Sequence, residues 1–154
     1  MSGSFEHVSF ELIKLNLRRS VFVQNHEHAR PAPGEVIAMG LSLKNGGEFL
    51  PDGMSADFLQ SFRTHGGPQL PFMLEAEFTA TFSMSRPVPE SDQENYIHRI
   101  FPQVIFPYTR EYVAETTRRG GFPPLLINMN LFPDGRGRSA GTAEASRGGS
   151  KLLH

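Results

Sequence analysis

The chain contains no cysteine and no tryptophan, and its charges are nearly balanced, with 15 basic and 16 acidic residues. The absence of cysteine excludes disulfides, thiolate nucleophiles and cysteine-based zinc sites, and it is typical of a reducing compartment. Balanced charge leaves no global positive field to attract nucleic acid. Residues 1–10 lack the features of a signal peptide, and no apolar run approaches the roughly 20 residues of a membrane helix. We therefore expect a cytoplasmic protein with no direct membrane insertion.

Catalytic and metal-binding motifs are also scarce. His26 and His28 form a His-x-His pair, but no third ligand is suggested, so a solvated loop is the favoured interpretation. Glu75 and Glu77 share one face of an expected strand, and no histidine is predicted to orient them as an acid–base pair. The glycine-containing turns match no phosphate-binding loop, and no serine lies in a nucleophile elbow. We therefore predict that the protein is not an enzyme and binds no metal and no cofactor.

Phenylalanine, in contrast, is abundant: 13 of the 154 residues are Phe and 3 are Tyr. Four of these rings precede a proline, in the pairs 101–102, 106–107, 122–123 and 132–133. A domain of this size buries so many rings only with difficulty, unless it self-associates or keeps an apolar groove. The pattern alone leaves two roles open for each ring, one in the core and one on a surface for self-association or extended peptides.

Alternating hydrophobicity predicts four strands, over residues 8–23, 36–43, 56–64 and 72–84. The last is the clearest, since seven apolar residues from Phe72 to Met84 occupy every second position. In the first strand the alternation changes phase near Leu12 and Ile13, which predicts a bulge. One packed and one solvated face are typical of antiparallel sheets. The fold class is therefore α+β, a four-stranded antiparallel sheet with helices packed on one face.

Helix signals follow the strands. Ser91 or Asp92 is placed to cap a short helix that ends near residue 101, and Pro107 is placed to begin a second helix over 107–119. Gly120 and Gly121 end that helix. From residue 134 the chain is rich in Gly, Ser and Ala, and we predict a disordered tail over 134–154 beyond one domain over 1–133.

The segment IFPYTREYVAETTRRGGFPPL, residues 105–125, resembles the bacterial protein-export chaperone SecB family. In that family Ile/Leu-Phe-Pro-Tyr-Ala-Arg-Glu leads into a helix that ends in Ser-Arg-Gly-Gly/Thr-Phe-Pro and a leucine. Strand 72–84 is similar to the family's long strand. The resemblance extends over roughly residues 8–132. Ten positions of the helical segment match at fixed spacing: Phe106, Pro107, Tyr108, Arg110, Glu111, Arg119, Gly120, Phe122, Pro123 and Leu125.

The resemblance implies a dimer of dimers in which helices are sandwiched between two sheets. Such proteins hold unfolded preproteins in apolar grooves and deliver them to the SecA export motor, without nucleotide or cofactor. By this resemblance Glu75 and Glu77 would lie on the outer, motor-docking face of the sheet. The residues that would line the client groove are Phe101, Ile105, Phe106, Tyr108, Tyr112, Phe122 and Leu125.

Two departures from the family pattern keep other functions open. Pro133 and Gly135 stand where the family begins a C-terminal helix, and the tail is weakly basic where the family's tail is acidic or binds the motor. A first alternative is a specialised SecB-like chaperone without SecA handover, for example one that guards an antitoxin. A second is a small-molecule-binding or enzymatic sheet-and-helix domain.

Overall fold

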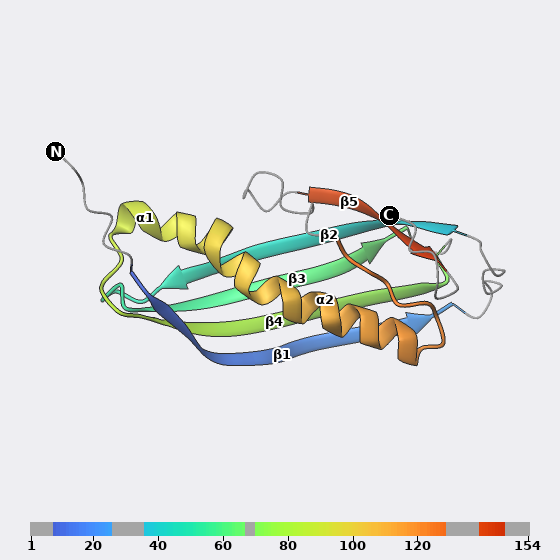
Figure 1. Ribbon diagram of the computed structural model, residues 1–154, viewed down its shortest axis with the longest axis horizontal. Coiled ribbons are helices and arrows are strands. Elements are labelled where there is room, and N and C mark those ends of the chain that lie inside the picture. The colour runs from blue at the N-terminus through green and yellow to red at the C-terminus, as the bar shows by residue number, and fades with distance from the viewer. Residues whose placement is uncertain (1–7, 26–35, 67–69, 129–138, 147–154) are drawn as a thin grey trace.

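The computed structural model describes residues 8–25, 36–66, 70–128 and 139–146. Its strands form one antiparallel sheet in the order β1-β4-β3-β2-β5, and its helices lie across one face of that sheet (Figure 1). The predicted α+β architecture is confirmed. The strands are β1 (Phe10–Gln24), β2 (Val36–Phe49), β3 (Ser55–His65), β4 (Phe72–Met84) and β5 (Ser139–Ser146); the helices are α1 (Glu90–Asn95), the π-helical turn η2 (Tyr96–Ile100) and α2 (Phe101–Arg119).

Strand β4 has the bounds and alternation that the sequence predicts. All seven residues that point toward the helices, from Phe72 to Met84, are buried, and those between them are exposed or half-buried. The partner positions on β3 continue this pattern, with Phe58 and Phe62 buried. We call the helix-covered side the inner face and the opposite side the outer face.

Strand β1 has two bulges where the sequence predicted one. The predicted bulge lies between Leu12 and Lys14, and the second lies between Leu17 and Arg19. Because each bulge shifts the alternation by one residue, Phe22 faces inward opposite Leu74. With a single bulge the alternation predicts that Val21 and Val23 share a face with Leu15 and Leu17. This prediction is wrong, because the second bulge places the two valines on the opposite face.

Strand β2 is longer than predicted: the sequence predicts a strand that ends at residue 43, and residues 44–49 continue it. Gly47 makes this pairing possible. A Cβ atom there would lie 2.4 Å from the backbone oxygen of Asp57 on β3, so the backbones approach closely where turn-forming residues suggested a break.

Helix α2 begins at Phe101, and Pro107 lies inside it, so the predicted start at Pro107 is wrong. Pro107 removes the N–H group that would bond to the carbonyl of Gln103. Both residues are on the exposed side of the helix, where water can satisfy that carbonyl. The short helix α1 begins at Glu90 after Pro89, with no capping hydrogen bond from a side chain, so the expected cap at Ser91 or Asp92 is also wrong.

The predicted end of α2 at Gly120 and Gly121 is confirmed. Gly121 adopts a left-handed φ of 84°, and the N–H groups of Gly121 and Phe122 donate to the carbonyls of Arg118 and Thr117. This is a Schellman ending, in which the left-handed residue is usually glycine. It returns the chain to the sheet, so that Phe122 packs 4.9 Å from the ring of Phe72.

Phe101 is the centre of the largest aromatic cluster between helix and sheet. Its ring stacks on Phe82, with 3.9 Å between ring centroids and 4° between ring planes. Four further rings lie within 6.0 Å of it: Phe10, Phe49, Phe58 and Tyr96. Burial of each such ring stabilises the fold by about 1.5–3 kcal/mol.

The tail differs from its prediction over one segment. Residues 139–146 form β5, which pairs antiparallel with β2, although the whole of 134–154 was expected to lack structure. Residues 134–138 and 147–154 lie outside the described residues. Small residues dominate β5, which explains why hydrophobic alternation did not reveal it.

Candidate functional site

Five of the seven residues expected to line a client groove are buried inside the single chain. Phe101, Ile105, Phe106 and Leu125 have no exposed surface, and Phe122 is 6% exposed. They pack between α2 and the inner face of the sheet. The sequence left a core role and a surface role open for each ring, and this packing gives these five a core role in the single chain.

Tyr108 and Tyr112, the other two, reach the surface of α2. Tyr108 is 45% exposed, and Tyr112 is half-buried one helical turn later. The ring of Tyr112 packs edge-on against Phe78 at 5.7 Å, and its hydroxyl group forms a hydrogen bond with that of Ser20 on β1. Leu17 on β1, which pairs with Phe78 on β4, is also exposed. We call Leu17, Tyr108 and Tyr112 the β1–α2 strip.

Strand β1 carries more exposed apolar surface than its edge position favours. Ile13 and Val23 are 59% and 52% exposed, and Val23 lies opposite the exposed Met73. Within the described part of the sheet, β1 is a terminal strand with no neighbour on its far side. Soluble proteins usually protect such edges with charge or cover them. The sequence showed these residues as strand positions, but only the strand order and the second bulge reveal that they are exposed.

The two glutamates expected on the outer face lie there, and both are paired with arginines from neighbouring strands. The carboxylate of Glu75 lies between Arg63 Nε at 3.1 Å and an Arg19 guanidinium nitrogen at 3.4 Å. Glu77 lies 4.0 Å from Arg18 Nε. The sequence did not indicate these pairs, because they join residues on different strands in the register of the sheet. Their effect is to neutralise the acidic character of this face.

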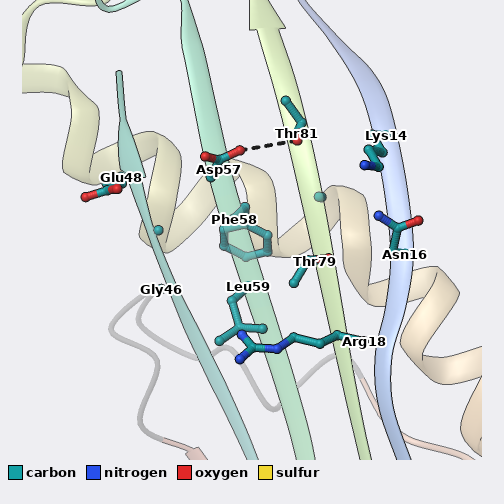
Figure 2. A pocket seen from close by; sticks show the side chains of 12 residues that line it. Lys14, Asn16, Arg18, Gly46, Glu48, Asp57, Phe58, Leu59, Thr79 and Thr81 are labelled. Atoms are coloured by element: carbon teal, nitrogen blue, oxygen red, sulfur yellow. Dashed lines mark hydrogen bonds between the residues drawn. The ribbon is translucent and has the colours of Figure 1, made fainter. Parts of the chain in front are cut away.

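The outer face also contains a depression of about 540 Å³ beside these ion pairs (Figure 2). Lys14 and Arg18 lie along its β1 side, and Glu48 and Asp57 along the opposite side. Gly46 contributes to the hollow, since a Cβ atom added there would meet nothing within 4 Å.

Hydrogen bonding in this depression does not form a catalytic arrangement. Thr81 donates to the Asp57 carboxylate at 3.2 Å, and the residues that line the depression include no histidine or serine. A small-molecule site usually has converging polar groups in an enclosed cavity, whereas here the charged groups stand on opposite sides of an open hollow.

Two further expectations concern metal and membrane. His26 and His28 lie outside the described residues. Within the described ranges, no group of three or more metal-binding side chains is present, and no helix has the length and apolar character to cross a membrane.

Sequence comparison confirms the resemblance to the SecB family. The family model described as preprotein translocase subunit SecB matches residues 58–132, just under half of the chain. The protein-export protein SecB of Hyphomonas neptunium is 33% identical over 94 residues, 58% of this chain and 56% of that protein. SecB of Nitrosomonas europaea is 37% identical over 64 residues, 42% of this chain and 39% of that protein. The matches thus span about half or less of the relatives' own length.

The fold is similar to that of a solved SecB-like chaperone from Mycobacterium tuberculosis, which was determined in complex with a peptide from the HigA1 antitoxin. The TM-score is 0.63, and the match covers 78% of this chain and 90% of the other at 21% sequence identity. Sequence and fold therefore agree: the chain has a SecB-like sheet-and-helix fold, and its matched segment includes β4, α2 and the Schellman ending.

Proposed function

We propose that the protein is an ATP-independent chaperone that holds unfolded or precursor proteins in the cytoplasm without nucleotide or cofactor. The observation that carries the proposal is exposed apolar surface on an edge strand and its neighbouring helix, in a chain that resembles SecB. Ile13, Leu17 and Val23 on β1 and Tyr108 on α2 are each more than 40% exposed. A stable monomer in water rarely leaves such a strand uncovered.

The exposed residues are suited to two kinds of partner. A second copy of the chain would cover the β1 edge, which supports assembly as a dimer and then as a dimer of dimers. An extended client would cover the β1–α2 strip, where the two tyrosines supply rigid, amphipathic contact area. Both contacts bury apolar surface at about 25 cal/mol per Å², so neither needs chemical energy from a nucleotide.

Light scattering tests this proposal through the aggregation of an unfolded client. We expect the tetrameric protein to suppress aggregation at stoichiometric concentration, and Tyr108→Ser to weaken suppression severalfold because it removes exposed ring surface. Glu111→Ser, at an exposed position on the same helix, is the matched control and should suppress aggregation normally. A monomer at micromolar concentration that gives no protection would overturn the proposal.

Delivery to SecA is a separate step, and the outer face favours the alternative without it. A motor that docks on acidic side chains needs free carboxylates, whereas Glu75 lies between Arg19 and Arg63. Charge complementarity with a basic partner is therefore weak at this position. The structural neighbour from Mycobacterium tuberculosis was solved with an antitoxin peptide, which supports a specialised client as the alternative to general export.

Binding of SecA to the intact protein distinguishes the two versions. If the protein serves export, Glu75→Lys weakens SecA binding at least tenfold and leaves client protection unchanged. If it is a specialised chaperone, SecA does not bind the wild-type protein while client protection persists. Arg63→Gln is a useful companion, because it frees one side of the Glu75 carboxylate and should strengthen any contact with a basic partner.

A further inference from the structure

The side of β2 away from β3 pairs with β5, a strand from the C-terminal part of the chain (Figure 1). Eight residue pairs join the two strands, from Val36 opposite Ser146 to Leu43 opposite Ser139. Strand β2 continues to Phe49. Over residues 44–49, no described strand lies beside β2 on the side away from β3.

The composition of β5 makes it a weak partner for this edge. Its sequence is SAGTAEAS, in which only Thr142 belongs to the residue types enriched in strands. Alanine, glycine and glutamate are depleted in strands, and alanine and glycine also offer little side-chain surface for cross-strand packing. Pairing with β2 therefore depends mainly on backbone hydrogen bonds, which an unrelated extended chain can supply equally well.

The β2 positions beneath this pairing are strongly apolar. Met39, Leu41 and Leu43 are at most 2% exposed and belong to the core. Their partners on β5 are Ala143, Gly141 and Ser139. A strand with large apolar residues at the three matching positions would pack against the rim of the core and gain on the order of tenfold in affinity over β5.

We propose that residues 36–49 of β2 form a binding edge for an extended apolar segment of an unfolded client, and that β5 is a built-in competitor which the client displaces. The inference rests on the proposed chaperone function and adds a second client site, on the side of the sheet opposite the β1–α2 strip. Because β5 belongs to the same chain, it competes at an effective concentration in the millimolar range. A client segment displaces β5 only if its side chains pack more favourably against β2 than those of β5 do. The edge therefore selects apolar extended chains over polar ones.

The test locks β5 in place with a reversible cross-link. The natural chain has no cysteine, so Ser42→Cys with Ala140→Cys creates a single thiol pair at directly opposed positions. Two thiol-free probes are used: a carboxymethylated unfolded protein and a lysine-flanked peptide of alternating valine and serine. We expect oxidation to lower the affinity for the peptide at least tenfold and the affinity for the unfolded protein, which also contacts the β1–α2 strip, severalfold. Reduction should restore both affinities.

Ser42→Cys alone is the matched control, since Ser42 bonds the His65 ring at 2.7 Å and its loss must be separated from the cross-link. Oxidant should leave the affinity of this control unchanged. Equal affinity of the oxidised and reduced double variant would overturn the role of β5 and leave the chaperone function intact. If neither probe binds in either redox state, the proposed function itself fails.

Hydrogen exchange on the unmodified protein provides a second readout. Client binding should speed exchange in residues 139–146 while residues 36–43 stay protected, because the client replaces one strand by another. If residues 139–146 become more protected when a client binds, the displacement model is overturned.

Discussion

The inner and outer faces of the sheet arise from the same strands and follow different chemistry. On β4 the inward residues from Phe72 to Met84 are buried against the helices, while Glu75 and Glu77 point outward into ion pairs with β1 and β3. Water is excluded from the inner face, so apolar contacts there stabilise the fold strongly. On the outer face water screens the charges, and ion pairs contribute little.

This contrast indicates how stability and recognition are divided. Substitutions on the inner face should unfold the protein, whereas substitutions on the outer face and at the sheet edges should leave the fold intact and change what binds. The exposed apolar residues of β1 and the small residues of β5 lie at the two edges of the described sheet. There, neither apolar burial against the helices nor screened ion pairing describes the surface. Four tests of the contrast follow, from the largest expected effect to the smallest.

Phe101→Ala should have the largest effect, because this ring is fully buried and contacts five others. Replacing a core phenylalanine by alanine costs about 3–5 kcal/mol, which is a large share of the stability of a typical domain. Urea unfolding followed by circular dichroism measures the loss. Phe101→Leu, which retains most of the volume, should lose distinctly less. A loss below about 1 kcal/mol for the alanine variant would show that this cluster is not the main core.

Two glycine-to-alanine substitutions compare the faces with the same chemical change. At Gly120, a Cβ atom would lie 2.5 Å from the ring of Phe22, so the packed side must shift, at a cost of about 1–3 kcal/mol. At Gly46, it would enter the outer-face depression, and alanine should be neutral or stabilise the strand by up to about 1 kcal/mol. Thermal unfolding of both variants checks the difference. Equal destabilisation would contradict the contrast between a packed and an open face.

Much of this contrast could be predicted from the sequence, because it follows from alternation. The sequence assigns the residues of β4 to the correct faces of the sheet. It also correctly predicts that α2 ends at Gly120 and Gly121. The second bulge of β1 could not be predicted, since the residues around Arg18 carry no turn signal and only pairing with β4 shows the shift. The predicted start of α2 at Pro107 is wrong for a similar reason. A proline is accommodated inside this helix because it lies on the side that faces water, and that depends on tertiary packing.

The candidate site was harder to predict than the fold. Aromatic abundance drew attention to α2, but periodicity does not indicate which rings the sheet covers. Phe106 is fully buried while Tyr108, two residues later, is 45% exposed. The ion pairs of Glu75 and the strand β5 depend on contacts between distant segments. Short-range patterns in the sequence carry no information about such contacts.

Gln60 is a buried polar residue on the otherwise largely apolar inner face and gives a third test. Its side chain is fully buried, accepts a hydrogen bond from Thr109 at 2.6 Å and donates to the Pro102 carbonyl at 3.2 Å. Gln60→Leu leaves the Thr109 hydroxyl without this partner, which should cost about 1–3 kcal/mol. The double variant Gln60→Leu with Thr109→Val should recover part of that loss. Additive losses in the double-mutant cycle would contradict direct coupling between the two side chains.

Glu115 on α2 gives the smallest expected effect and tests the claim that ion pairs in water contribute little. A hydrogen bond from Arg119 Nε at 2.9 Å, together with the nearby Arg118, lowers the pKa of the Glu115 carboxyl group despite some opposing desolvation. A lowered pKa in the folded state means that the contribution to stability is present above the unfolded pKa and is lost as pH falls through the folded value. Glu115→Gln should therefore unfold slightly more easily than wild type at neutral pH, and the difference should vanish in acid. Melting temperatures of both proteins across this range measure it, with Glu111→Gln, one turn earlier on the same helix, as the control. A difference that persists in acid would show that Glu115 acts through packing or helix propensity and not through its charge.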